Sequence, residues 1–171
     1  PDVDYALHEE DVPFLCEQYE ELAEGMLERK KKGEGFNFYH YTIDLTGGPC
    51  IYKRVAGCGV GTEYQAVTPT GDLYPCHQFV GNDEMLMGNV YEGVTHPEIV
   101  EMFLKGNNVY TRDKCRDCFA KRYCAGGCSA NNYHSNGDID KVYELGCELH
   151  RKRIECAIML KVAEQELGLE E

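Results

Sequence analysis

The chain has 171 residues, with 17 lysines and arginines against 30 aspartates and glutamates, and a net charge of −13. This acidic balance disfavours binding to duplex nucleic acid or to an anionic membrane surface, because both attract basic patches. The apolar run from Cys156 to Leu160 ends at Lys161, far short of the roughly 20 residues that span a bilayer. The length suits one domain of ordinary size, or one domain with an extra arm. We expect neither a nucleic-acid nor a membrane partner.

The first expected element is a helix that begins near Asp11 and Pro13, an N-cap residue followed by a proline in the first turn. Apolar residues recur at helical spacing as far as Met26. The lysine run 30–32 suits the negative end of a helix dipole, and Gly33 favours termination there.

Three short strands are expected next. Residues 36–45 are aromatic and β-branched, with alternating polar positions, which predicts a strand. Residues 63–68 and 73–76 flank a turn that contains Gly71, which predicts a β-hairpin with Cys76 at the end of its second strand.

The sequence of the C-terminal part predicts two further helices and a loop between them. A short helix begins at Pro97 and ends at Gly106. The polar residues 131–140 indicate a loop, and a final helix is expected over residues 145–167. Cys147 begins that helix, whereas Cys156 lies inside it and is expected in the core. These elements together predict an α+β fold.

The ten cysteines are the most informative feature of the composition, and three explanations compete: disulfides, metal ligation and scattered core thiols. A chain of this length can bury a hydrophobic core without disulfides or metal ions to stabilise it. Disulfides are typical of small secreted scaffolds. We therefore disfavour disulfides and expect a cytoplasmic protein. The positions are Cys16, Cys50, Cys58, Cys76, Cys115, Cys118, Cys124, Cys128, Cys147 and Cys156.

Four cysteines lie within residues 115–128, in the pattern C-x2-C-x5-C-x3-C. A C-x2-C step lets two sulfurs converge on one metal centre. Gly126 and Gly127 allow the backbone to approach such a centre closely and to direct N–H groups at sulfur. Structural zinc sites usually pair two short steps per ion, so the single C-x2-C favours an iron–sulfur centre over zinc.

The whole pattern is Cys58-x12-Gly71-x4-Cys76, then residues 115–128, then Cys147. It resembles the seven-cysteine signature of the SPASM domain, which carries auxiliary clusters in radical S-adenosylmethionine enzymes. The stretches 57–64 (GCGVGTEY) and 74–81 (YPCHQFVG) are similar to those of the SCIFF maturases, which form thioether crosslinks of the sactipeptide type.

The resemblance implies two [4Fe–4S] clusters. The first would be held by Cys58, Cys76 and Cys128, with Cys50 either as the fourth ligand or as a bystander. The second would be held by the ligands Cys115, Cys118, Cys124 and Cys147. The neighbouring His77 is either a hydrogen-bond donor to the first cluster or an ordinary surface or packed histidine. Cys16 is expected to be an ordinary thiol.

The resemblance also implies that the chain is one portion of a larger enzyme. Residues 1–49 would link from an upstream, partial TIM-like barrel, residues 50–150 would form the SPASM domain, and residues 151–171 a C-terminal helix. The radical signature C-x3-C-x2-C does not occur in the sequence, since Asn131 stands where its third cysteine would be. S-adenosylmethionine and a third [4Fe–4S] cluster are thus expected only upstream, and these residues alone are expected to be inactive, with no catalytic residue of their own.

In such an enzyme, a 5′-deoxyadenosyl radical removes a hydrogen from a ribosomally made, cysteine-rich precursor peptide, and a peptide thiolate bonds to that carbon. The auxiliary clusters would orient the thiolate and carry electrons, with an external electron donor or acceptor as partner. Two alternatives use the same cysteines: a ferredoxin-like electron-transfer module without peptide chemistry, and a zinc-stabilised interaction domain.

Overall fold

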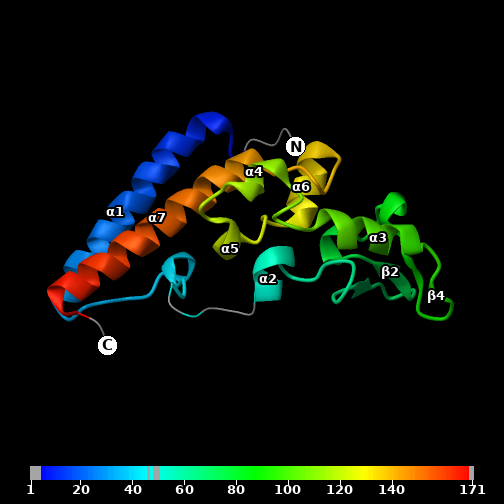
Figure 1. Ribbon diagram of the computed structural model, residues 1–171, viewed down its shortest axis with the longest axis horizontal. Coiled ribbons are helices and arrows are strands. Elements are labelled where there is room, and N and C mark those ends of the chain that lie inside the picture. Colours follow the sequence, from blue (N-terminus) through cyan, green and yellow to red (C-terminus); the bar gives the residue numbers. More distant parts are fainter. Residues whose placement is uncertain (1–4, 46, 48–50, 170–171) are drawn as a thin grey trace. The chain divides into compact units, whose positions relative to one another are not determined.

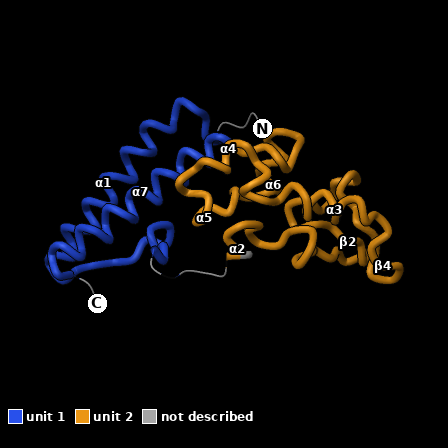
Figure 2. Tube along the Cα trace, in the orientation of Figure 1, with its two compact units in different colours: residues 1–48, 144–171 blue, residues 49–143 orange. Residues whose placement is uncertain are grey.

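The computed structural model describes residues 5–45, 47 and 51–169. It contains two compact units, residues 1–48 with 144–171 (unit 1) and residues 49–143 (unit 2), which are distinguished by colour in Figure 2. Helices predominate, and four short strands form one antiparallel sheet (Figure 1). The expected α+β class is therefore confirmed.

Unit 1 is built on two long helices, α1 (Val12–Lys31) and α7 (Glu144–Leu167). Pro13 lies in the first turn of α1, three basic residues lie in its last turn, and Gly33 follows with a φ of 75°. Both expected helices are confirmed. The Asp11 carboxylate accepts a hydrogen bond from the His8 N–H at 2.8 Å. This bond stabilises the 3₁₀ turn η1 (Glu9–Asp11), which comes directly before α1.

The core of unit 1 lies between α1, α7 and the 3₁₀ turn η2 (Tyr39–Tyr41). The Tyr41 hydroxyl donates to the carbonyl oxygen of Tyr19 at 2.6 Å. Lys152 pairs with Glu20 at 2.6 Å along the edge of the helix pair. The buried residues of this core are Ala23, Tyr41, Cys156, Ala157 and Leu160. The expectation that Cys156 lies in the core is confirmed.

The strand predicted for residues 36–45 is wrong, because η2 occupies the middle of this segment. Tyr41 is buried, and the rings of Phe38 and Tyr41 meet edge-to-face with centroids 4.8 Å apart. The aromatic residues therefore pack against the helices of unit 1, and this tertiary packing overrides their β-propensity.

The sheet of unit 2 is a meander in which each strand pairs with the next along the chain. Its strands are β1 (Ala66–Val67), β2 (Asp72–Tyr74), β3 (Gly88–Asn89) and β4 (Gly93–Val94). Ala66 pairs with Tyr74 across the turn that contains Gly71, whose φ is 92°. The predicted hairpin is confirmed, although its strands are shorter than the segments 63–68 and 73–76.

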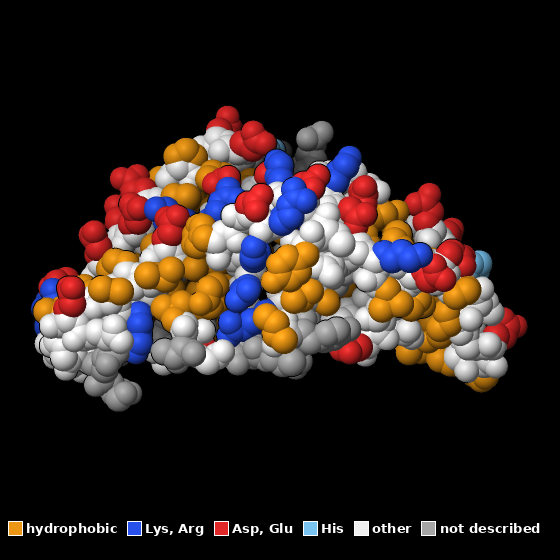
Figure 3. Space-filling model, in the orientation of Figure 1, with side chains coloured by type: hydrophobic (Ala, Val, Ile, Leu, Met, Phe, Trp, Pro, Cys, Tyr) orange, Lys and Arg blue, Asp and Glu red, His pale blue; other side chains and the backbone are white. Residues whose placement is uncertain are grey.

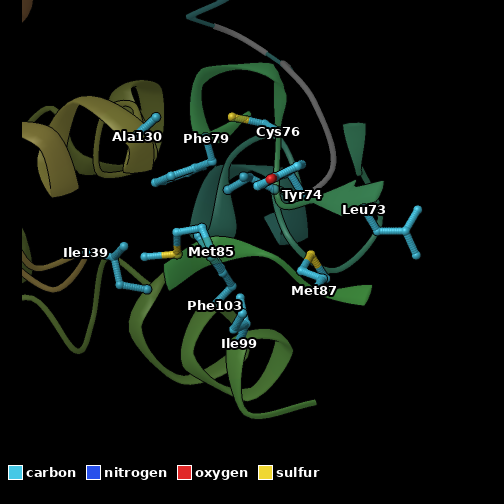
Figure 4. Close-up of a cluster of buried hydrophobic side chains, with 11 residues drawn as sticks. Leu73, Tyr74, Cys76, Phe79, Met85, Met87, Ile99, Phe103, Ala130 and Ile139 are labelled. Carbon is cyan, nitrogen blue, oxygen red and sulfur yellow. The ribbon is translucent and has the colours of Figure 1, made fainter. Parts of the chain in front are cut away.

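Helix α3 (Pro97–Gly106) packs against this sheet and is confirmed at both ends. Figure 4 shows the side chains of Ile99 and Phe103 directed from α3 into the hydrophobic cluster below the strands. Phe79 lies in the same cluster, with its ring centroid 5.8 Å from that of Phe103. It comes from η3 (His77–Phe79), and Met85 comes from η4 (Asp83–Met85).

Short helices complete unit 2. They are α2 (Ile51–Ala56), α4 (Asp113–Arg116), α5 (Lys121–Cys124) and α6 (Ser129–Asn136). The loop predicted for residues 131–140 is therefore wrong over its first half. Ser129, Ala130 and Asn132 are the buried residues of α6, and Gly137 ends it with a φ of 71°. The Asn132 side chain is buried and hydrogen-bonded to the Gly126 carbonyl, which a polar composition does not reveal.

No helix within the described residues is long and apolar enough to cross a membrane. Acidic side chains are distributed over the visible face of each unit and do not gather in one patch (Figure 3).

Candidate metal centre

Cys58 lies on a loop that three glycines shape. Gly57, Gly59 and Gly61 all have φ values near the left-handed region, between 72° and 73°. A Cβ atom on Gly61 would lie 2.6 Å from the Phe103 ring, so this glycine permits close packing of the loop on the core. Val60 is buried at 2% exposure, whereas Cys58 is exposed. The loop is thus anchored by its apolar residue and presents the thiol outward.

Cys76 follows β2 and is buried. Burial raises the pKa of its thiol, and the nearby thiols of Cys128 and Cys58 raise it further by charge repulsion. Backbone hydrogen bonds of Gln78 and Phe79 act in the opposite direction and lower this pKa. Cys58, Cys76 and Cys128 are therefore neighbours in the structure.

Gln78 connects two of the surrounding segments. Its side-chain Nε2 donates to the Sγ of Cys128 at 3.4 Å, and its carbonyl oxygen accepts from Nε2 of His134 at 3.0 Å. The ring of His77 instead lies 3.4 Å from the Tyr64 hydroxyl, measured from Nδ1. Gln78 thus contacts a thiol, whereas His77, for which a donor role was one of two alternatives, contacts Tyr64.

The second group of thiols lies on α4, α5 and the turn between them. Cys115 is buried, and its carbonyl accepts from the N–H of Cys118 at 3.1 Å. Burial raises the pKa of Cys124, the N–H groups of Gly127 and Gly126 lower it, and the neighbouring Cys118 raises it. The segment 115–124 therefore brings these three cysteines into one short region.

A left-handed backbone run joins the two groups. Ala125, Gly126 and Gly127 have φ values of 54°, 82° and 76°. The N–H group of Gly127 donates to the Cys124 carbonyl at 3.2 Å, and backbone hydrogen bonds of Gly127 and Gly126 lower the pKa of the Cys124 thiol. Cys128 follows immediately, so one turn separates a thiol of the first group from a thiol of the second.

Four buried polar residues surround this turn: Asn107, Arg112, Ser129 and Asn132. The Asn107 amide donates to the Ala56 carbonyl at 2.6 Å, and its Oδ1 accepts from the Ser129 hydroxyl at 2.8 Å. The Asn132 amide donates to the Gly126 carbonyl at 3.1 Å. Sequence reasoning did not single out these residues, because isolated asparagines and arginines carry no spacing signal.

The remaining cysteines lie elsewhere. Cys147 lies in the first turn of α7, as expected, and α7 belongs to unit 1, so unit 2 itself provides three members of the second proposed set. Cys50 lies outside the described residues. Cys16 is partly exposed on α1, and burial raises the pKa of its thiol.

Within the described ranges, no three His, Cys, Asp or Glu side chains converge in the arrangement that one metal ion requires. Cys76 nevertheless lies near Cys58 and Cys128, Cys124 lies near Cys118, and the Gln78 side chain donates an N–H to the Cys128 sulfur. Sulfur ligands with N–H donors around them are the chemical surroundings of iron–sulfur clusters. The donor set therefore fits such clusters.

A search against models of known protein families finds no match. The chain is similar to a protein of the archaeon Archaeoglobus fulgidus that is described as an "Uncharacterized protein", with 27% identity over 100 residues. The match covers 57% of this chain and 24% of the archaeal protein. The chain therefore spans about a quarter of the length of this relative.

Proposed function

We propose that this chain is the auxiliary iron–sulfur portion, of the SPASM type, of a radical S-adenosylmethionine enzyme that forms thioether crosslinks in a cysteine-rich peptide. The observation that carries this proposal is that two groups of thiols are neighbours in unit 2, Cys76 with Cys58 and Cys128, and Cys124 with Cys118. The resemblance to the SPASM signature implies ligand sets to which these groups belong. The upstream barrel, the peptide and the external electron acceptor belong to the proposal.

The residues of the chain would have two roles: some would bind the clusters, and others would orient the sulfur ligands. Cys58 and Cys128 are exposed, whereas Cys76 is buried, so the first site would be accessible from solvent through its two exposed ligands. Gln78 and the N–H groups after Cys76 would fix the orientation of the sulfur atoms. When bound, the clusters would supply a soft site for a substrate thiolate and a route for electrons.

The proposal is tested by anaerobic reconstitution of the chain with iron and sulfide, followed by measurement of both elements and of zinc. We expect two clusters, about eight irons and eight sulfides per chain. Cys118→Ala should diminish the second cluster, and Cys16→Ala, which removes a thiol outside both sets, should change neither. A colourless protein that binds zinc and no iron or sulfide would establish the interaction-domain alternative instead.

The peptide chemistry needs the longer enzyme and a separate readout. Cys76→Ala in that enzyme should abolish thioether formation. Mass spectrometry detects this because the treated peptide then keeps the two hydrogens that crosslinking removes. Addition of a cysteine-containing peptide to the reconstituted chain should also alter the spectrum of one cluster. Retention of the crosslink in the absence of both clusters would contradict the proposal. An unchanged cluster spectrum would favour the electron-transfer module.

A further inference from the structure

Arg112 is among the largest fully buried side chains, with 1% exposure. Its Nη1 donates to the Gly126 carbonyl at 3.0 Å, and its Nη2 donates to the Ile139 carbonyl at 2.7 Å and to Asn107 Oδ1 at 3.3 Å. Its Nε also donates to the Ile139 carbonyl, at 3.0 Å. Burying a guanidinium group costs several kcal/mol unless its N–H groups are satisfied. The burial of Arg112 therefore indicates that its position serves a purpose that offsets this cost.

The guanidinium contacts the turn that joins the two thiol groups. A Cβ atom on Gly126 would lie 2.3 Å from Nη1 of Arg112, so a glycine at position 126 is required for this contact. The hydrogen bond to the Gly126 carbonyl restrains this turn, in which the Gly127 N–H also donates to the Cys124 carbonyl at 3.2 Å. Arg112 therefore holds in place the backbone between Cys124 and Cys128.

The same side chain is linked to the first thiol group through Asn107. Asn107 binds the hydroxyl of Ser129, the residue after Cys128. It also binds the carbonyl of Ala56, which lies two residues before Cys58. One buried network thus reaches the backbone beside cysteines of both groups.

Charge gives Arg112 a second effect. A cluster ligated by thiolates carries a net negative charge, and reduction makes it more negative. A fixed positive charge in a buried environment stabilises the reduced form more than it would in water.

We propose that Arg112 is a positioning residue for the clusters, which orients the 125–127 turn and raises the reduction potential of the cluster that Cys115, Cys118 and Cys124 help to bind. This inference rests on the proposed iron–sulfur function. It concerns a residue that touches the backbone around the sites and belongs to neither ligand set.

The test compares reduction potentials of the reconstituted chain in three variants, by EPR-monitored redox titration. In Arg112→Gln we expect the potential of the second cluster to fall, with about a tenfold change in the reduction equilibrium, or ~59 mV for one electron. Arg112→Lys keeps the charge but loses the planar fork, so we expect an intermediate potential. Arg122→Gln removes an exposed arginine close in sequence and should leave the potential unchanged.

Thermal unfolding of the metal-free variants separates positioning from folding. A purely structural role predicts lower stability with wild-type potentials, and this result would overturn the inference. If Arg112→Gln does not fold, Arg112→Lys alone tests the positioning role. A wild-type reduction potential in the cluster-loaded lysine variant would then overturn the inference. If the wild-type chain itself takes up no iron and sulfide, the proposed function fails, and that outcome is recognised before any variant is compared.

Discussion

Gln78 and His77 are neighbours in the sequence whose side chains contact different partners. The Gln78 amide donates to the Cys128 sulfur, and the His77 ring contacts the Tyr64 hydroxyl. An N–H donor stabilises the more negative, reduced state of a thiolate-ligated cluster, and so raises its reduction potential. Under the proposed function, the glutamine is therefore the side chain that adjusts the first cluster.

Gln78→Leu should lower the reduction potential of the cluster bound by Cys58, Cys76 and Cys128, because it removes one donor to sulfur while keeping the ligands. His77→Leu is the matched control and should leave that potential unchanged. Redox titration of the two reconstituted variants makes the comparison. A shift in the histidine variant without one in the glutamine variant would assign the donor role to His77.

At the scale of single residues, the sequence predicts contacts that depend on short spacing. The expectation that Gly126 and Gly127 allow a close approach of the backbone is met at Gly126, where a Cβ atom would collide with the Arg112 side chain. The contact between Gln78 and Cys128 joins residues 50 positions apart. It depends on how η3 and the segment before α6 pack, so no local pattern could indicate it.

Helix α3 offers a matched pair of adjacent side chains. Phe103 is 1% exposed in the core of unit 2, and Leu104 is 61% exposed. Phe103→Ala should destabilise the metal-free protein by about 3–5 kcal/mol through lost burial and a cavity. Leu104→Ala should change stability by less than about 0.5 kcal/mol. Urea unfolding measures both, and equal effects would show that α3 buries a different face.

His150 on α7 makes the stability of unit 1 dependent on pH. Burial lowers its pKa from the usual 6.5, and the charges of Arg153 and His40 lower it further. The neutral ring is therefore favoured in the folded state. The neutral His150 ring therefore contributes fully to the stability of the folded protein above pH 6.5. This contribution is lost as the pH falls through the pKa of His150 in the folded state, which lies below 6.5.

His150→Gln should consequently reduce the loss of stability below pH 6.5. Thermal unfolding of the metal-free protein at a series of pH values from 7.5 down to 5 checks this expectation. Identical slopes for the variant and the wild type would show that His150 remains as easily protonated in the folded protein as in the unfolded one.

At the scale of elements, helices with clear end signals are predicted correctly, as Pro97 and Gly106 illustrate for α3. The two errors share a cause. Residues 36–45 and 131–140 have compositions typical of a strand and a loop, but Tyr41 and Asn132 take their conformations from buried tertiary contacts. Local composition does not contain that information.

The units differ in their expected dependence on metal. The long helices α1 and α7, of 20 and 24 residues, pack through an apolar core in unit 1. Most proposed ligands lie in the short, loop-rich elements of unit 2. Anaerobic chelation of the reconstituted chain should therefore leave most of the helical signal in far-UV circular dichroism. Loss of more than about half of that signal would show that unit 1 also requires the metal.

The division of the whole molecule was not evident from the sequence. The expected boundaries at residues 49 and 150 follow the cysteines, whereas the structure places residues 144–150 on α7 with the N-terminal segment. The pairing of α1 with α7 includes the ion pair of Glu20 and Lys152, 132 residues apart. Two amphipathic helices at such separation give no sign that they are partners.

This long-range pairing has a consequence for the order of folding during synthesis. Unit 2 is one continuous segment whose strands pair with their neighbours, so its core can assemble as soon as residue 143 has left the ribosome. Helix α1 is made before unit 2 and α7 after it, so α7 cannot cover the apolar face of α1 until unit 2 is complete. The apolar face of α1 thus lacks its partner helix throughout the synthesis of unit 2, and α1 is the segment that a chaperone would protect.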